Sequence, residues 1–445
     1  MTTGTTTPGA APAAPATGGT MSASRATFLG VGAMVGAGIF ALLGEAGAVA
    51  GSAVWLSFLL GGLICLLQGY SFAKLGTRFP SRGGTLEYIM RGFGPGHLTG
   101  TTTWLLLLSV IVVAAMVAVS FGGYAAALIG GDDASPLLAK VLSVVIVVAI
   151  TFVNLSGASA AAKLSSLVVV TLTVLLVFSV AGLTQADPAL LAPETYPEFR
   201  KILGSIALTF FAFLGFGVIA FSAQDIREPA KNLPKAMYAA IVIATVTYVA
   251  VALSVFGTLT LAEVIEAGDN ALAVAAEPIF GQIGFLGVSL VALLATASAL
   301  NSNLYAATGA TRQLGSQSLI PPVLGRRAGK DGSVGLLVGG LTAAVMAIAL
   351  DLSAIAALGS AVSLLVFIIA GLAHLRVLDQ TGANRWIVWA SILSAGLVFV
   401  MFVVSTFIDA PSQIVLIGVI VVLAIVLELA WSRVRDRGRP VVTPA

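Results

Sequence analysis

The strongest constraint on this chain is a series of long apolar segments that recurs from residue 26 to residue 431. A helix needs about 20 apolar residues to cross the roughly 30 Å hydrocarbon core of a bilayer. Segments of that length predict an all-α membrane protein with twelve transmembrane helices. They lie near residues 26–50, 52–74, 101–129, 136–155, 163–184, 201–225, 235–257, 279–308, 333–350, 353–375, 386–408 and 412–431.

The composition excludes the main alternatives. Hydrophobic residues make up 58% of the chain and charged residues 9%. A soluble domain carries about 25% charged residues, so this chain cannot cover a water-exposed surface, and it is too apolar to be disordered. Its net charge of +3 is too small to indicate a nucleic-acid partner. Membrane lipid is the expected surrounding.

The distribution of basic residues predicts the orientation. If the N-terminus is cytoplasmic, all but three of the 22 Lys and Arg residues fall in cytoplasmic loops, the exceptions being Lys140, Arg200 and Lys201. This bias follows the positive-inside rule and predicts a protein of the cell membrane with both termini in the cytoplasm. Residues 1–25 are expected to be a disordered tail, and residues 432–445 a basic cytoplasmic tail.

Glycines interrupt two of the predicted spans near the middle of the membrane. Span 1 contains Gly36-Ala37-Gly38, and span 6 contains Gly215-Phe216-Gly217. Close helix packing explains such glycines too, and Gly32 with Gly36 fits the small-xxx-small spacing. However, interruptions at matching places in two halves of a chain are the best sequence indication of a transporter binding site. We therefore expect two inverted repeats, residues 26–184 and 201–375, followed by two peripheral helices in 386–431.

Interrupted helices expose backbone groups that can bind charge. Unpaired N–H groups around Gly36, Ala37, Gly38 and Ile39 would suit a carboxylate, helped by the positive end of the helix dipole. Carbonyls near Gly32 and Val35, and near Phe211 and Phe213 in span 6, would suit an ammonium group or a small cation. Together these groups describe a site for an α-amino acid that needs no charged side chain.

Four stretches resemble one family. Residues 36–40, Gly-Ala-Gly-Ile-Phe, resemble the first-span signature of the amino acid–polyamine–organocation (APC) transporters. Residues 78–88, 210–236 and 299–321 resemble the family's loop after span 2, its span 6 with the cytoplasmic exit, and its span 8 with the following loop. The resemblance implies a LeuT-type fold, with five-helix inverted repeats whose first helices (spans 1 and 6) are broken, and secondary transport by alternating access.

The resemblance also implies a substrate site. In the family the first-span backbone holds the substrate carboxylate, which here means Gly36 to Ile39 with Val35 beside them. Span 6 holds the amino group and closes over the site with an aromatic ring. The matching residue is Phe211; Phe213 and Phe216 are further candidates, and Gly215 lies between them. Arginine–agmatine exchangers of the family carry a Glu where this chain has Gly217, so we expect a neutral amino acid.

The coupling ion is left open between sodium and a proton. Sodium-coupled relatives bind the ion between span-1 carbonyls, here of Gly32 and Val35, and span-8 hydroxyls, here of Thr296, Ser298 or Ser302. Several proton-coupled relatives have a Lys in span 5, but residues 170–173 contain none. Glu45 in the outer half of span 1 is a second candidate, either as a proton carrier, as a residue lining the outer vestibule or as an interfacial carboxylate.

The sequence thus predicts a secondary active transporter of an amino acid. An exchanger of amino acids or amines, and a non-transporting amino acid sensor, fit the same scaffold, and the sequence indicates no oligomeric state. The chain has no zinc-protease, serine-hydrolase or phosphate-loop motif, so we expect no enzyme. His97 and His374 do not have the spacing of metal ligands, and apart from a coupling sodium ion no cofactor is expected.

Overall fold

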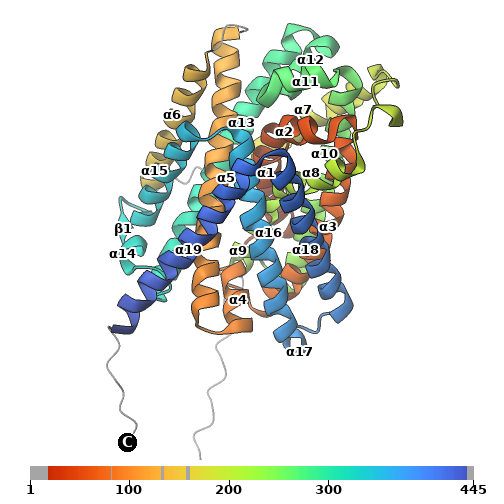
Figure 1. The fold of residues 1–445 in the computed structure, drawn as a ribbon. Coiled ribbons are helices and arrows are strands. Elements are labelled where there is room, and N and C mark those ends of the chain that lie inside the picture. The colour runs from red at the N-terminus through yellow and green to blue at the C-terminus, as the bar shows by residue number, and fades with distance from the viewer. Residues whose placement is uncertain (1–18, 82, 132–134, 157–160, 438–445) are drawn as a thin grey trace, which may run out of the picture.

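The computed structural model describes residues 19–81, 83–131, 135–156 and 161–437, which are almost entirely helical. The outer parts of the two predicted tails, residues 1–18 and 438–445, lie outside the described residues. Most of the long helices run roughly from top to bottom in Figure 1, with α11 and α12 at the upper end and α4 and α17 at the lower end. The prediction of a helical membrane protein is confirmed.

The helices fall into two groups. The helices of the bundle are α1 (Ala23–Ala37), α2 (Ile39–Ala50), α3 (Val54–Arg78), α5 (His97–Gly130), α6 (Pro136–Leu155), α7 (Ala161–Gln185), α8 (Phe199–Ala212), α9 (Gly217–Phe221), α10 (Pro229–Thr258), α13 (Gln282–Ser316), α15 (Val334–Ala349), α16 (Leu352–Arg376), α18 (Arg385–Asp409) and α19 (Pro411–Arg437). The short helices that connect them are η1 (Gly51–Ala53), α4 (Thr85–Phe93), η3 (Pro193–Thr195), η4 (Leu214–Phe216), η5 (Ala223–Asp225), α11 (Leu261–Ala267), η6 (Gly268–Asn270), α12 (Ala271–Phe280), α14 (Pro322–Gly325) and α17 (Leu378–Thr381).

Ten helices in the described part of the chain are long and apolar enough to cross a membrane. Two of the twelve predicted spans account for the difference. Span 1 is divided at Gly38, and its second half, α2, continues through η1 into α3 as one apolar run, Ile39–Arg78. Span 9 corresponds to α15, which has only 16 residues. The twelve-span count therefore stays a prediction.

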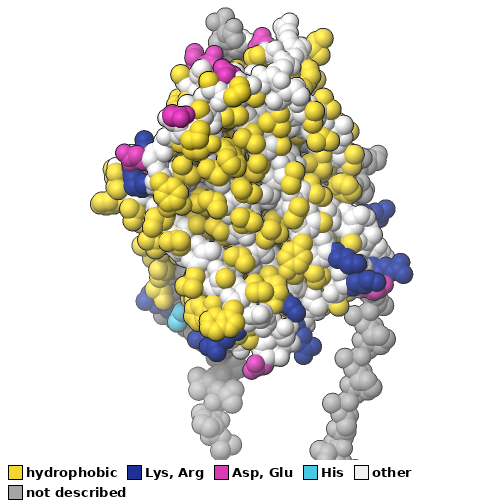
Figure 2. Space-filling model, turned by 90° about the vertical axis from the view of Figure 1, so that its right-hand side faces the viewer, with side chains coloured by type: hydrophobic (Ala, Val, Ile, Leu, Met, Phe, Trp, Pro, Cys, Tyr) yellow, Lys and Arg dark blue, Asp and Glu magenta, His cyan; other side chains and the backbone are white. Residues whose placement is uncertain are grey.

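The outer helices present apolar side chains to their surroundings. Phe152 on α6 is 66% exposed, and Leu176 on α7 is 64% exposed. Figure 2 shows hydrophobic side chains over the middle of one face, with most of the Lys and Arg on that face toward the lower end. A bilayer would cover such an apolar belt, and the basic end is the one that the positive-inside rule predicts for the cytoplasm.

The interior is formed where α1 packs against α10 and α13, and α5 packs against α13 and α16. Aromatic rings fill the space beside the sixth span. Phe72, Phe216 and Phe367 come from α3, η4 and α16, and their ring centroids lie 5.0–5.5 Å apart. This packing lies beside the place where α8 ends and η4 begins.

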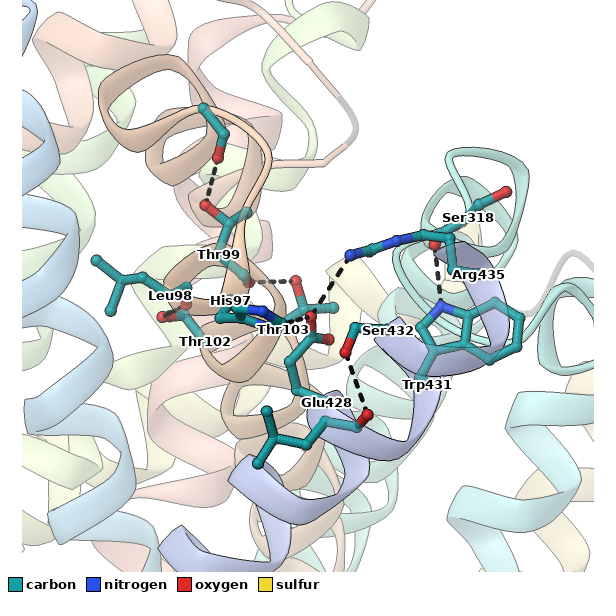
Figure 3. A network of polar contacts seen from close by, with 12 residues as sticks. His97, Leu98, Thr99, Thr102, Thr103, Ser318, Glu428, Trp431, Ser432 and Arg435 are labelled. Carbon is teal, nitrogen blue, oxygen red and sulfur yellow. Dashed lines mark hydrogen bonds and ion pairs between the residues drawn. The ribbon is translucent and has the colours of Figure 1, made fainter. Parts of the chain in front are cut away.

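The last helix, α19, is attached to α5 and to the segment after α13 by a network of polar contacts (Figure 3). The carboxylate of Glu428 is fully buried, 3.6 Å from Nδ1 of His97 and 3.8 Å from the guanidinium of Arg435. It lies against Gly100 of α5, where a Cβ atom would overlap it. The indole N–H of Trp431 donates a hydrogen bond of 3.0 Å to the carbonyl of Ser318. These contacts join α19 to α5 and support a structural role for Glu428.

One small element was not expected from the sequence. Strands β1 (Arg327–Ala328) and β2 (Gly332–Ser333) pair antiparallel between α14 and α15. The turn between them contains Gly329 at φ +66°, and the N–H of Lys330 donates a hydrogen bond of 2.8 Å to the carbonyl of Leu155. Because this pairing depends on the end of α6, no local sequence pattern indicates it.

Candidate functional site

The first predicted break is present but narrow. The helix is interrupted only at Gly38, between α1 and α2, where φ is −94° and ψ is −76°. The Gly38 N–H donates to the carbonyl of Met34 at 2.6 Å, and the Gly38 carbonyl accepts from the N–H of Leu42 at 2.8 Å. The sequence predicted an unwound stretch from Gly36 to Ile39, and this was too broad. Gly36 and Ala37 remain in α1, and the N–H of Gly38 is already bonded.

The second predicted break is wider. The α-helix ends at Ala212, η4 follows with 3₁₀ geometry, and α9 resumes at Gly217. Tight i→i+3 bonds mark the change, since the N–H of Phe213 bonds the carbonyl of Phe210 at 3.0 Å. A 3₁₀ segment in the middle of a helix often marks a hinge or a functional site.

The two breaks lie directly against each other. A Cβ atom on Gly215 would overlap the Met34 amide nitrogen and lie 2.5 Å from the carbonyl carbon of Ala33. A Cβ atom on Gly38 would lie 2.7 Å from the carbonyl oxygen of Ala212. The hydroxyl of Tyr248 on α10 donates a hydrogen bond of 3.2 Å to that same carbonyl. Glycine is therefore required at positions 38 and 215, because a side chain at either position would overlap the backbone of the other span.

A cavity of about 70 Å³ opens beside this contact. It is bordered by α1, α4, α5, α8, η4, α9, α13 and α16, and no described residue that lines it is charged. Its polar groups include Asn303 and the hydroxyls of Ser109 and Ser363, which lie 3.0 Å apart. Met116 and Val113 supply part of its apolar wall. A cavity without charged side chains suits a small molecule whose remaining substituents are uncharged. Any charged groups of that molecule would have to be stabilised by backbone dipoles.

Three of the predicted substrate residues line this cavity, namely Ala37, Phe211 and Gly215. The rings of Phe213 and Phe216 do not line it. Phe213 packs on Tyr248 with ring centroids 5.0 Å apart, and Phe216 belongs to the aromatic packing of α3 and α16. Gly38 and Ile39 border neither this cavity nor the second one, although both are buried.

A second, smaller cavity of about 10 Å³ lies on the other side of α1. Gly32, Val35 and Gly36 of α1, Thr171 of α7 and Ser298 of α13 line it. Its volume admits roughly one particle of the size of water. Three of the predicted ion-binding residues, Gly32, Val35 and Ser298, are thus brought together around one small space.

The other predicted ion-binding residues lie elsewhere. The hydroxyl of Thr296 donates to the carbonyl of Ala292 at 2.7 Å, and that of Ser302 donates to the carbonyl of Ser298 at 3.0 Å. Neither lines the small cavity. Glu45 belongs to α2 and also lies away from it, so it cannot share that site.

The sequence analysis missed five polar residues, Thr171 at the small cavity and Thr85, Ser109, Asn303 and Ser363 at the larger one. Thr171 at the small cavity lies within residues 170–173, a stretch that the sequence analysis considered only for the absence of a Lys. Ser109 and Ser363 at the larger cavity are hydroxyls in the middle of apolar spans. Polar side chains in such places commonly bond across helices or line a site, and this was the available signal.

Comparison with known proteins gives the family. The sequence profile described as amino acid permease matches residues 21–430. The chain belongs to the amino acid permease family. This agrees with the resemblance to APC transporters and identifies a membrane transporter.

Relatives of this permease have varied names. The inner membrane transport protein YbaT of Escherichia coli is 30% identical over 91% of this chain and 94% of its own length. The methylthioribose transporter of Bacillus subtilis is 25% identical over 68% of each chain. The branched-chain amino acid permease BcaP of Bacillus subtilis is 26% identical over 53% of this chain and 54% of its own length. The substrate of this permease must therefore be argued from its own cavity.

Proposed function

We propose that this permease is a secondary active transporter that carries a neutral α-amino acid across the cell membrane by alternating access, coupled to a proton or sodium gradient. The observation that carries the proposal is the contact between the two helix breaks beside a cavity that no charged side chain lines within the described part of the chain. Membership of the amino acid permease family supports it.

The backbone supplies the charge partners of the substrate. The start of α2 directs the positive end of its dipole toward the break at Gly38, and a substrate carboxylate is stabilised at such a helix N-terminus. The end of α8 contributes the carbonyls of its last turn near Phe211, which suit the ammonium group. Because the N–H of Gly38 already bonds Met34, carboxylate binding requires α1 and α2 to separate slightly at this residue. The side chain of the substrate would then lie near Val113 and Met116.

The small cavity is our candidate for a sodium site. Backbone carbonyls near a helix break are typical sodium ligands in transporters of this kind. Those of Gly32 and Val35, in the last two turns of α1 before the break at Gly38, would serve here. Ser298 and Thr171 would add hydroxyl oxygens. The Thr171 hydroxyl donates to the carbonyl of Leu167 at 3.0 Å and keeps its lone pairs for a cation. A proton remains the alternative coupling ion.

The proposed architecture is twelve spans in a LeuT-type arrangement. The first repeat would run from α1 to α7 and the second from α8 to α16, with α18 and α19 peripheral. The basic lower end would face the cytoplasm, which places both termini there.

Uptake into proteoliposomes tests the function. A labelled neutral amino acid should enter saturably, and a melting-temperature screen of the twenty amino acids, with and without sodium and at two pH values, should identify the ligand and the ion. Gly38→Leu should abolish uptake because its side chain would displace Tyr248 and the Ala212 carbonyl. Exchange without net uptake would indicate an exchanger, and binding without flux would indicate a sensor. Unaltered uptake by the Gly38→Leu variant would refute the site.

A further inference from the structure

A short hairpin closes the upper end of the bundle over α2. The hairpin consists of α11, η6 and α12, and η6 lies against α2 and α5. The approach is close, since a Cβ atom on Gly44 would overlap the carbonyl of Gly268. Because α2 is the second half of the broken first span, this contact couples the hairpin to the substrate site. An opening of the cavity toward the upper end would have to separate the hairpin from α2.

Two carboxyl groups lie close to this contact, each on the residue next to one of its glycines. Glu45 projects from α2 and Asp269 from η6, both are partly buried, and their charges act on each other. Asp269 lies in a slot against α5, where a Cβ atom on Gly123 would be 3.2 Å from its Oδ2 atom. Ser353 of α16 is within hydrogen-bonding reach of Glu45. Two carboxylates held together in this way repel each other when both are ionised.

A buried hydroxyl faces the same pair. Tyr124 on α5 is fully buried, its ring packs edge-on against Phe40 with centroids 6.0 Å apart, and it interacts electrostatically with Asp269. Its hydroxyl has no hydrogen-bond partner among the described residues. A buried polar atom is normally bonded, so this donor is available to an ionised Asp269 carboxylate nearby.

No Lys, Arg or His in the described part of the chain compensates the charge of this pair. Among the described residues, no Lys, Arg or His forms an ion pair with Glu45 or Asp269. The charged group that also acts on Glu45, Asp351 before α16, is acidic. The remaining acids of the hairpin point elsewhere: Glu263 caps α11 at Thr260, and Glu266 and Glu277 are exposed. The described residues also contain no group of three ligands suited to a metal ion.

We propose that Glu45 and Asp269 form a proton-binding site that holds the hairpin closed over α2, so that transport depends on the pH at the upper, predicted outer, face. This inference rests on the proposed function for its transport readout. The proton comes from the water at that face when the hairpin closes and returns to the same water when it opens. The site therefore controls the gate and does not itself carry a proton across the membrane.

The electrostatics give the direction of the effect. Burial, and next the charge of Glu45, raises the pKa of Asp269 to about 7 in the closed hairpin. In an open hairpin the carboxyl would be in water, where an Asp has a pKa of about 4. The closed state therefore binds the proton more tightly, and the closed-to-open ratio falls as the pH rises from about 4 to about 7 and levels off above it. One such carboxyl predicts a loss of about tenfold between pH 6 and 8.

Hydrogen exchange measures the gate directly. Protection of residues 261–280, corrected for intrinsic exchange, should fall about tenfold between pH 6 and 8 in the native chain. Asp269→Asn should remove this pH dependence. Glu45→Gln should reduce it because the repulsion that raises the pKa of Asp269 is lost, and Tyr124→Phe should increase it because the ionised carboxylate loses a donor. Glu266→Gln, an exposed acid on the same hairpin, is the matched control and should behave as the native chain.

Counterflow of a labelled neutral amino acid, with equal pH on both sides of a proteoliposome, supplies the second readout. Its rate should follow the same pH profile and become flat in Asp269→Asn. If Asp269→Asn or Glu45→Gln leaves both the protection profile and the counterflow profile unchanged, the inference is wrong while the transport function stands. If no neutral amino acid shows counterflow at any pH, the proposed function fails. The hydrogen-exchange experiment then still tests whether Glu45 and Asp269 hold the hairpin closed.

Discussion

Gly215→Ala should disrupt the contact between the two helix breaks. The added Cβ atom would lie 2.5 Å from the carbonyl carbon of Ala33 and 2.8 Å from the Cα atom of Met34. Carbon atoms pack best at about 3.5–4.0 Å, so η4 must move away from α1 by about 1 Å. The atoms it meets belong to backbone, and no flexible side chain can yield in their place.

Two effects of this displacement can be estimated. Overpacking of an interior usually costs about 1–3 kcal/mol, and we expect a destabilisation in that range. Misplacement of binding groups by about 1 Å can lower an activity on the order of 100-fold, and we expect a comparable loss of uptake. The loss of uptake should thus be much larger than the loss of folded protein.

The assay combines proteoliposome uptake with an apparent melting temperature in detergent. Gly309→Ala is the matched control because Gly309 is an exposed glycine within α13, about two turns before the helix ends, and a Cβ atom there would meet nothing within 4 Å. Replacing a helical Gly by Ala favours the helix by about 1 kcal/mol, so this control should be as stable as the native chain or more so. If Gly215→Ala retained native uptake and stability, the contact between the breaks would not have the role that we give it.

Two further changes test the small cavity and the anchor of the last helix. Ser298→Ala should abolish any stabilisation by sodium in a melting-temperature assay while leaving amino acid binding in excess sodium largely intact; an unchanged sodium response would remove the small cavity as the ion site. Glu428→Gln should lower the melting temperature by several degrees because the contacts with His97 and Arg435 lose their charge partner. Glu428 does not line the substrate cavity, so the affinity for the amino acid should stay within about twofold, and a large change in that affinity would contradict a purely structural role.

Hydropathy alone predicted much of the fold. Runs of about 20 apolar residues specify membrane helices because a backbone in lipid must satisfy its own hydrogen bonds. Counting apolar runs gives the wrong number of long helices where a span is short or interrupted. The 16 residues of α15 and the division at Gly38 explain why the count of long helices in the structure differs from the predicted number of spans.

The candidate site was predictable only in part. Glycine pairs showed where the first and sixth spans would break, since glycine is costly in a helix unless backbone must come close. They did not show the width of each break, which depends on what packs around it. Phe213 and Phe216 illustrate this limit. The ring of Phe213 packs on Tyr248 and that of Phe216 packs on Phe72 and Phe367, so neither lines the cavity.

The sequence by itself determined that this chain is a helical membrane transporter with paired breaks, because hydropathy and glycine placement act through local backbone energetics. Only the tertiary structure decided which groups meet. It brought Thr171 to the small cavity beside Gly32, and it set Asp269 next to Glu45 across more than two hundred residues of chain. Such encounters depend on how helices pack, and no local pattern in the sequence specifies them.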